Sequence, residues 1–171
     1  MEPSGSLICV SAVDHLIHSN AEYVIDFPGA RPVKPKLRLT VVTCMDSRLD
    51  LFGALGLHIG DAHLLRNAGG MITDDILRSL AISQRKLGTR EIVVIHHTDC
   101  GMENFDDDQF RAELTDETGI APTWDVPGFT DARARVRESV ARVRECTWLP
   151  YREDVRGFVF DVKTAHIDEV S

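Results

Sequence analysis

The chain has 171 residues, within the roughly 100–200 residues of one typical domain, so we expect a single domain with a substantial core. Hydrophobic residues make up 43% and charged residues 27%, which excludes collagen-like, disordered and disulfide-scaffold proteins. The net charge of −8 argues against a nucleic-acid or anionic-membrane partner. No apolar run approaches the ~20 residues of a membrane span.

The N-terminal sequence and the cysteines favour a reducing compartment. Residues 1–6 lack the basic region and the long apolar stretch of a secretory signal, so we expect a cytoplasmic protein. The cysteines are too few and too scattered for a disulfide framework. They are Cys9, Cys44, Cys100 and Cys146. In a reducing compartment such residues are core side chains, metal ligands or nucleophiles.

The first 36 residues differ in pattern from the rest. Apolar residues recur at helical spacing between Val13 and Val24, which predicts an amphipathic helix. Residues 27–36 contain three prolines and are typical of an extended segment. We therefore divide the chain into an N-terminal helical arm with its lead-in, residues 1–36, and an α/β domain, residues 37–171.

The α/β domain alternates between two periodicities. Thr73 is a good N-cap for a helix that Gly88 ends. The expected strands span residues 37–44, 62–66, 91–96 and 155–162, and the expected helices span residues 74–87, 107–118 and 131–146. Strands that alternate with helices predict right-handed crossovers and a mainly parallel central sheet flanked by helices. The fold class is therefore a single-domain α/β protein.

Two short segments, each just past a predicted strand, carry the residues suited to chemistry. Cys44, Asp46 and Arg48 follow the first strand, and His97 and Cys100 follow the strand at 91–96. In open α/β sheets ligands bind outside the carboxyl ends of the strands, so the two segments meet if these strands are neighbours. Two thiolates and one imidazole suit zinc, and three protein ligands leave the fourth position open, as in catalytic sites.

Simpler readings of these residues stay open. A cysteine after a strand is usually a small core residue, and one H-x-x-C pair can arise by accident. Asp46 and Arg48 favour a functional site, because an aspartate and an arginine two apart on a loop form a bidentate pair. That pair holds a carboxylate ready to interact with zinc-bound water. The backbone N–H groups of Gly69 and Gly70 support Asp46 or the substrate, unless the two glycines only form a turn.

The combination of C-x-D-x-R with a later H-x-x-C resembles the β-class carbonic anhydrases. The resemblance covers roughly positions 37 to 170 and includes further segments of the chain. These are Arg66-Asn67-Ala68-Gly69-Gly70, Ser79-Leu80, Leu87-Gly88 and Gly157-Phe158-Val159-Phe160-Asp161. The chain is similar to the compact branch of that family, which also contains enzymes acting on carbonyl sulfide or carbon disulfide.

The resemblance implies a fold, a cofactor and a reaction. It implies one Zn²⁺ per subunit held by Cys44, His97 and Cys100, and reversible hydration of carbon dioxide to bicarbonate by a zinc-bound hydroxide. Asp46 would orient the hydroxide and Arg48 would hold Asp46. In some members the equivalent aspartate becomes a fourth zinc ligand in a closed state, and the sequence fits both states.

Two further expectations concern partners and alternatives. The resemblance implies a homodimer or a higher homo-oligomer, with N-terminal segments crossing between subunits. Hydrolysis of carbonyl sulfide or carbon disulfide at the same zinc site remains an alternative activity. A non-catalytic zinc-binding structural domain is the alternative of another class, although such a domain needs no Asp46–Arg48 pair.

Overall fold

The computed structural model describes residues 11–126 and 128–170, and the chain separates into two compact units, Met1–Arg31 and Pro32–Ser171. In the first unit, α1 (Ala12–Ile25) begins with a capping box. The Asp14 backbone N–H donates to the Ser11 hydroxyl, and the Ser11 backbone N–H donates to the Asp14 carboxylate. No residue of α1 is buried. Residues 1–10 of the predicted arm lie outside the described residues.

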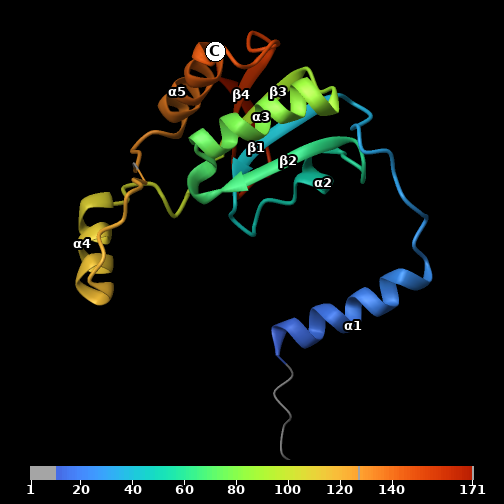
Figure 1. The fold of residues 1–171 in the computed structure, drawn as a ribbon, viewed down its shortest axis with the longest axis horizontal. Coiled ribbons are helices and arrows are strands. Elements are labelled where there is room, and N and C mark those ends of the chain that lie inside the picture. Colours follow the sequence, from blue (N-terminus) through green and yellow to red (C-terminus); the bar gives the residue numbers. More distant parts are fainter. Residues whose placement is uncertain (1–10, 127, 171) are drawn as a thin grey trace, which may run out of the picture. The chain divides into compact units, whose positions relative to one another are not determined.

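The second unit is built on one five-stranded sheet with the strand order β2-β1-β3-β4-β5 (Figure 1). The strands are β1 (Leu39–Cys44), β2 (Ala62–Asn67), β3 (Glu91–His97), β4 (Val155–Phe160) and β5 (Ile167–Val170). The first four run parallel, and β5 runs antiparallel to β4. The predicted mainly parallel α/β sheet is confirmed, and β1 and β3 are neighbours at its centre.

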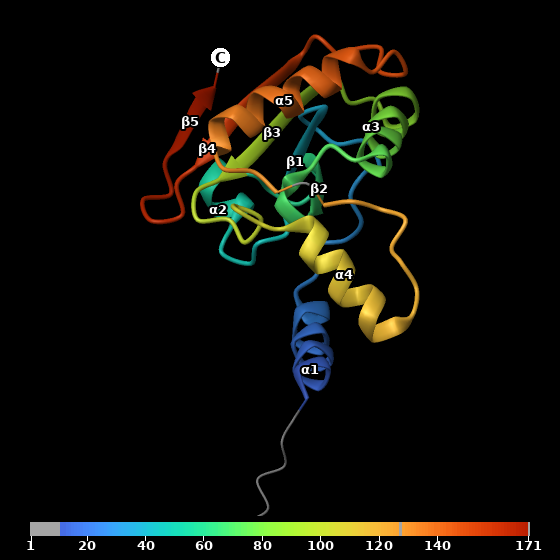
Figure 2. The ribbon, with the colours of Figure 1, turned by 90° about the vertical axis from the view of Figure 1, so that its left-hand side faces the viewer.

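Helices cover the two faces of the sheet unequally (Figure 2). The helices are α2 (Leu51–Leu55), α3 (Asp74–Leu87), α4 (Asp107–Thr118) and α5 (Ala132–Glu145), with a 3₁₀ turn η1 at Ala68–Gly70. Val42 of β1 packs in one apolar cluster with Leu80 of α3 and Val136 of α5. Its neighbour Val41 points to the other face and clusters with Leu51 of α2, as the two-residue period of a strand requires. Among the described helices, none is long and apolar enough to cross a membrane.

Two predicted strands are shorter than expected, and two short elements were missed. The strand predicted over residues 37–44 begins at Leu39, because Arg38 adopts a positive φ of 55°. The strand predicted over residues 155–162 ends at Phe160, because the Asp161 N–H donates to the His166 carbonyl in a turn. The missed elements, α2 and β5, have five and four residues, too few to show a clear period.

Candidate metal centre

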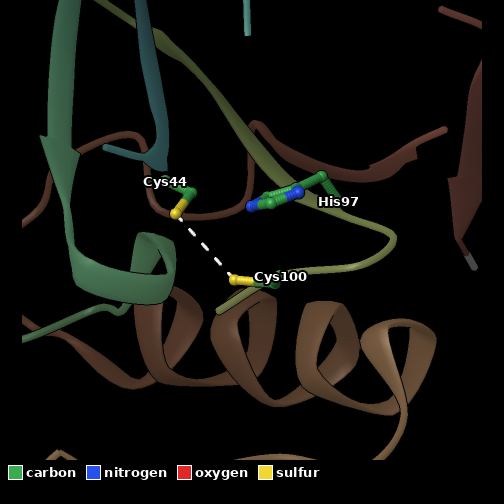
Figure 3. Close-up of side chains that lie close together, drawn as sticks. All are labelled: Cys44, His97 and Cys100. Carbon is green, nitrogen blue, oxygen red and sulfur yellow. Dashed lines mark hydrogen bonds between the residues drawn. The ribbon is translucent and has the colours of Figure 1, made fainter. Parts of the chain in front are cut away.

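The carboxyl ends of β1 and β3 bring together three of the residues singled out in the sequence. Cys44 ends β1, His97 ends β3 and Cys100 follows three residues later. Their ligand atoms all lie within 4.8 Å of one another, and all three residues are buried. The two sulfur atoms are 3.9 Å apart. Figure 3 shows both sulfurs facing each other with the imidazole ring directed toward them.

Strand alternation decides which of two adjacent histidines joins this cluster. His96 points to the face covered by α5, where its Nε2 lies 2.9 Å from the Ser139 hydroxyl, and its ring packs edge-on against Phe129. Burial lowers the pKa of His96 to about 4, so this side chain is a neutral core residue near pH 7. His97 points to the opposite face, toward Cys44.

The donor set of the cluster fits Zn²⁺. The Nδ1 atom of His97 lies 2.9 Å from the Thr98 carbonyl oxygen, so Nδ1 carries the proton and donates it. Nε2 of His97 is buried and, like Nδ1 of His96, has no hydrogen-bond partner. Unlike Nδ1 of His96, it lies beside the two cysteine sulfurs, where a cation could accept its lone pair. Tetrahedral zinc with Zn–S bonds of ~2.3 Å holds two sulfurs about 3.8 Å apart, which matches the observed spacing.

The hydrogen bonds and charges around the cluster shift the pKa values of its side chains in a way that favours binding of a cation. The pKa of Cys44 is lowered, mainly because the Cys100 thiol donates a hydrogen bond to it, with further lowering from His97 and from the backbone N–H groups of Asp46 and Gly69. The pKa of Cys100 is raised, because its proton is shared with the Cys44 thiolate and because the side chain is buried. For His97, burial lowers the pKa, but the Cys44 thiolate outweighs it and the net shift is upward. These shifts favour the thiolate form of Cys44, and the thiolate is the form in which a cysteine binds zinc.

Asp46 and Arg48 form the predicted bidentate pair beside the cluster. Arg48 Nε–H donates to Asp46 Oδ1 over 3.0 Å, and Arg48 Nη2–H donates to Oδ2 over 2.7 Å. The Arg48 backbone N–H also donates to Oδ1 over 2.9 Å. These hydrogen bonds hold the pKa of the Asp46 carboxyl far below its usual range. Asp46 Oδ2 is 3.8 Å from His97 Nε2, so an ionised carboxylate borders the place where the three ligand atoms converge.

The end of β2 and the turn η1 that follows it hold the segment that carries Cys44 and Asp46. Arg66 donates from Nε to the Cys44 carbonyl over 2.9 Å and from Nη2 to the Asp46 carbonyl over 2.5 Å. Gly70 has a φ of 66°, and a Cβ atom there would lie 2.9 Å from the Cys44 nitrogen. Among the described residues, neither Gly69 nor Gly70 donates to the Asp46 carboxylate. The Gly69 backbone N–H donates to Cys44 instead, and Gly70 lies against the Cys44 backbone.

The role of Arg66 was not anticipated from the sequence. The family resemblance includes the segment Arg66–Gly70, but it does not show what Arg66 contacts. The Arg66 side chain reaches the backbone carbonyls of Asp46 and Cys44, which lie 20 and 22 residues earlier in the chain. The periodicity of the sequence does not indicate contacts between segments so far apart. Asp99, which also contacts Arg48, was missed for the same reason.

The comparisons with known proteins agree with this fold. A family model described as carbonic anhydrase matches residues 39–139. "Beta-carbonic anhydrase 1" of Mycobacterium tuberculosis is 46% identical over 162 residues, covering 95% of this chain and 99% of that protein. The crystal structure of the carbonic anhydrase from Streptococcus mutans superposes with a TM-score of 0.86 and 44% identity, covering 94% of this chain and 98% of that one. "Carbon disulfide hydrolase" of Acidithiobacillus thiooxidans is 35% identical over 151 residues, covering 76% of this chain and 75% of that protein.

The parallel sheet, the buried Cys2His cluster at its carboxyl edge and these matches define one class: the chain belongs to the β-carbonic anhydrase family. The resemblance stated from the sequence motifs is thereby confirmed.

Proposed function

We propose that this protein is a zinc-dependent carbonic anhydrase, which interconverts carbon dioxide and bicarbonate with one Zn²⁺ per subunit held by Cys44, His97 and Cys100. One observation carries the proposal: the orphaned Nε2 of His97 converges with two sulfurs at a point bordered by the Asp46 carboxylate. A purely structural site needs no fixed carboxylate beside its ligands. The likeness to carbonic anhydrases over nearly the whole chain supports the same conclusion.

When bound, zinc lowers the pKa of water in its open position so that a nucleophile is available near neutrality, a property for which carbonic anhydrases are themselves the usual example. The residues of this chain supply orientation. Asp46 is ionised and can only accept hydrogen bonds, so it would align the attacking water by accepting a hydrogen bond from it. Arg48 fixes both oxygens of that carboxylate. Cys44, His97 and Cys100 are buried, which limits competing water on their side of the site.

The pairing of Asp46 with Arg48 supports the open state. Ligation of the metal by Asp46, the closed state, requires the carboxylate to leave two hydrogen bonds to the guanidinium. Arg48 and zinc therefore compete for the same carboxylate, and the bidentate ion pair opposes ligation.

Stopped-flow hydration of carbon dioxide on protein of measured zinc content tests the proposal. We expect rapid hydration by the wild type, and an Asp46→Ala variant that keeps its zinc and loses most of the rate. The exposed carboxylate of Asp108 on α4 offers a matched control, because Asp108→Ala removes an equal charge away from the site. Zinc-loaded wild type that hydrates carbon dioxide no faster than Asp46→Ala would overturn the proposal.

The same preparation separates the alternative activities. Parallel assays with carbonyl sulfide and carbon disulfide compare the rates directly, and faster hydrolysis of either would assign the site to that reaction. The carbon disulfide hydrolase relative makes this comparison necessary. Fully zinc-loaded protein that acts on none of the three substrates would favour a structural zinc domain.

We also propose a homodimer in which the arm of residues 1–36 packs on the partner subunit. Apolar side chains of α1 are exposed, among them Val13, Leu16 and Ile17, and such a stripe is stable when it is covered. On the face of the sheet that carries α2, Leu64 and Val93 are only partly buried. Deletion of residues 1–30 should shift the molar mass from dimer to monomer in light scattering. An unchanged dimer would contradict the crossing arm.

A cytoplasmic location completes the proposal. The Cys44 and Cys100 sulfurs lie 3.9 Å apart, and a disulfide between them would remove two of the three ligands. A reducing compartment keeps both thiols available for the metal.

A further inference from the structure

Arg48 has a second partner besides Asp46. Its Nη1–H donates to Asp99 Oδ2 over 2.7 Å, and its Nη2–H donates to the Asp99 backbone carbonyl over 2.7 Å. The guanidinium thus presents its Nε–Nη2 edge to Asp46 and its Nη1–Nη2 edge to Asp99. Asp99 lies between His97 and Cys100 in the chain, so Arg48 links the two segments that carry the candidate metal ligands.

The backbone of Asp99 is set for this contact. Its φ is 54°, in the left-handed region that most residues avoid and that aspartate and asparagine tolerate best. In this conformation the carbonyl and the carboxylate of one residue both accept from the same guanidinium. An uncommon backbone conformation combined with a double contact indicates a specific role for the side chain.

Exposure shows why Arg48 needs a second anchor. The Arg48 side chain is 45% exposed, whereas the Asp46 side chain is only 16% exposed. A long, half-exposed arginine has many rotamers, and ordering it opposes binding to Asp46 each time the pair forms. The Asp99 side chain is itself 70% exposed, but two acceptors on that one residue, its carboxylate and its carbonyl, restrict the rotamers of Arg48 before Arg48 engages Asp46.

We propose that Asp99 is a positioning residue, which holds Arg48 so that the Nε–Nη2 edge faces Asp46. Asp99 acts through Arg48 and keeps Arg48 in place whether Asp46 is paired with it or has moved away. The kinetic consequence rests on the proposed carbonic anhydrase activity, whereas the anchoring of Arg48 does not.

Two substitutions suit the backbone at this position. Asp99→Gly removes the side-chain acceptor and permits a positive φ, and Asp99→Asn keeps an oxygen acceptor while it removes the charge. We expect both zinc-loaded variants to retain full metal content. We expect kcat to fall on the order of 10-fold in Asp99→Gly, the equivalent of one charge-assisted hydrogen bond, and less in Asp99→Asn, with KM unchanged.

A double-mutant cycle distinguishes positioning from a general structural effect. In an Arg48→Ala background, Asp99→Gly should cause no further loss, because its only route to the site has been removed. Asp168→Asn is the matched control, since Asp168 also pairs with an exposed arginine, Arg133, over 3.1 Å. That variant should leave the rate unchanged.

Nuclear magnetic resonance on the zinc-loaded protein supplies a readout independent of activity. The Nε–H signal of Arg48, assigned by its loss in Arg48→Ala, should be sharp and slowly exchanging in the wild type. It should exchange faster in Asp99→Gly. If the wild type proves inactive toward carbon dioxide, the proposed function fails, and this signal alone still decides whether Asp99 anchors Arg48.

Three results would overturn the inference. An unchanged Arg48 signal in Asp99→Gly would show that Asp99 does not hold the side chain. An equal loss of rate with and without Arg48 would show that Asp99 acts independently of it. Loss of zinc from Asp99→Asn, which preserves the backbone preference, would assign Asp99 to the folding of the ligand loop.

Discussion

Replacement of Gly70 by alanine tests how closely the loop after β2 controls the metal ligand Cys44. Gly70 has a φ of 66°, and an added Cβ would lie 2.9 Å from the Cys44 nitrogen and 3.0 Å from the Thr43 carbonyl carbon. Both are backbone atoms, which cannot rotate out of the way. The left-handed conformation costs about 1–2 kcal/mol, and the overpacking adds about 1–3 kcal/mol. We therefore expect Gly70→Ala to lower the free energy of unfolding by about 2–5 kcal/mol.

Gly56 provides a matched control for the backbone contribution. Its φ is 63°, and a Cβ there meets nothing within 4 Å, so Gly56→Ala should lower the free energy of unfolding by only about 1–2 kcal/mol. The excess in Gly70→Ala measures the displacement of Cys44. Urea unfolding of both variants gives the free energies, and competition with a chromophoric chelator gives zinc affinity. We expect zinc affinity to fall about 10- to 100-fold in Gly70→Ala and to stay unchanged in Gly56→Ala. Equal unfolding energies and equal zinc affinities in the two variants would refute the reasoning.

Four further substitutions probe the site and the surface. Cys100→Ser should lose most of its zinc, because a serine hydroxyl is far harder to deprotonate than a thiol, whereas Cys146→Ser should bind zinc like the wild type in metal analysis. Arg48→Ala should keep its zinc but lose most activity, and a near-normal hydration rate would remove the ion pair from the mechanism. Arg156 lowers the pKa of Glu169 below its ordinary 4.5, so the stability that this pair adds is present above that pH and is lost as the pH falls through the lowered pKa. Carboxyl titration by nuclear magnetic resonance should show the Glu169 pKa rising toward 4.5 in Arg156→Gln, and an unchanged pKa would contradict the pairing.

Sequence patterns predicted those helices and strands whose structure depends mainly on their own residues and end caps. The helix over residues 74–87 was predicted from its cap at Thr73 and its stop at Gly88, and α3 has these bounds. β5 was missed because two of its four residues are acidic. Its strand conformation depends on pairing with β4 and on the contact of Glu169 with Arg156 across the two strands, which are tertiary features.

In the candidate site, too, residues within short motifs were predicted, whereas residues that act through contacts between distant segments were not. Cys44, Asp46, Arg48, His97 and Cys100 were selected because their types and spacings are local, and the structure places all five at one edge of the sheet. The supporting contacts of Arg66 and Asp99 join segments 20 to 51 residues apart. Their geometry exists only once the strand order is known, so no spacing rule identifies them.

The separation of the ligands along the chain has a consequence for the order of events in folding. His97 and Cys100 lie within one loop, but Cys44 is 56 residues from Cys100 and reaches it only when β1 has paired with β3 in parallel. Parallel pairing across such a distance requires the loss of considerable chain entropy and forms late. An unfolded chain therefore offers the ion only two neighbouring ligands, and the full set appears with the native sheet. Zinc bound at the proposed site would favour the folded state by mass action, and its uptake during refolding would report the closing of the central strand pair.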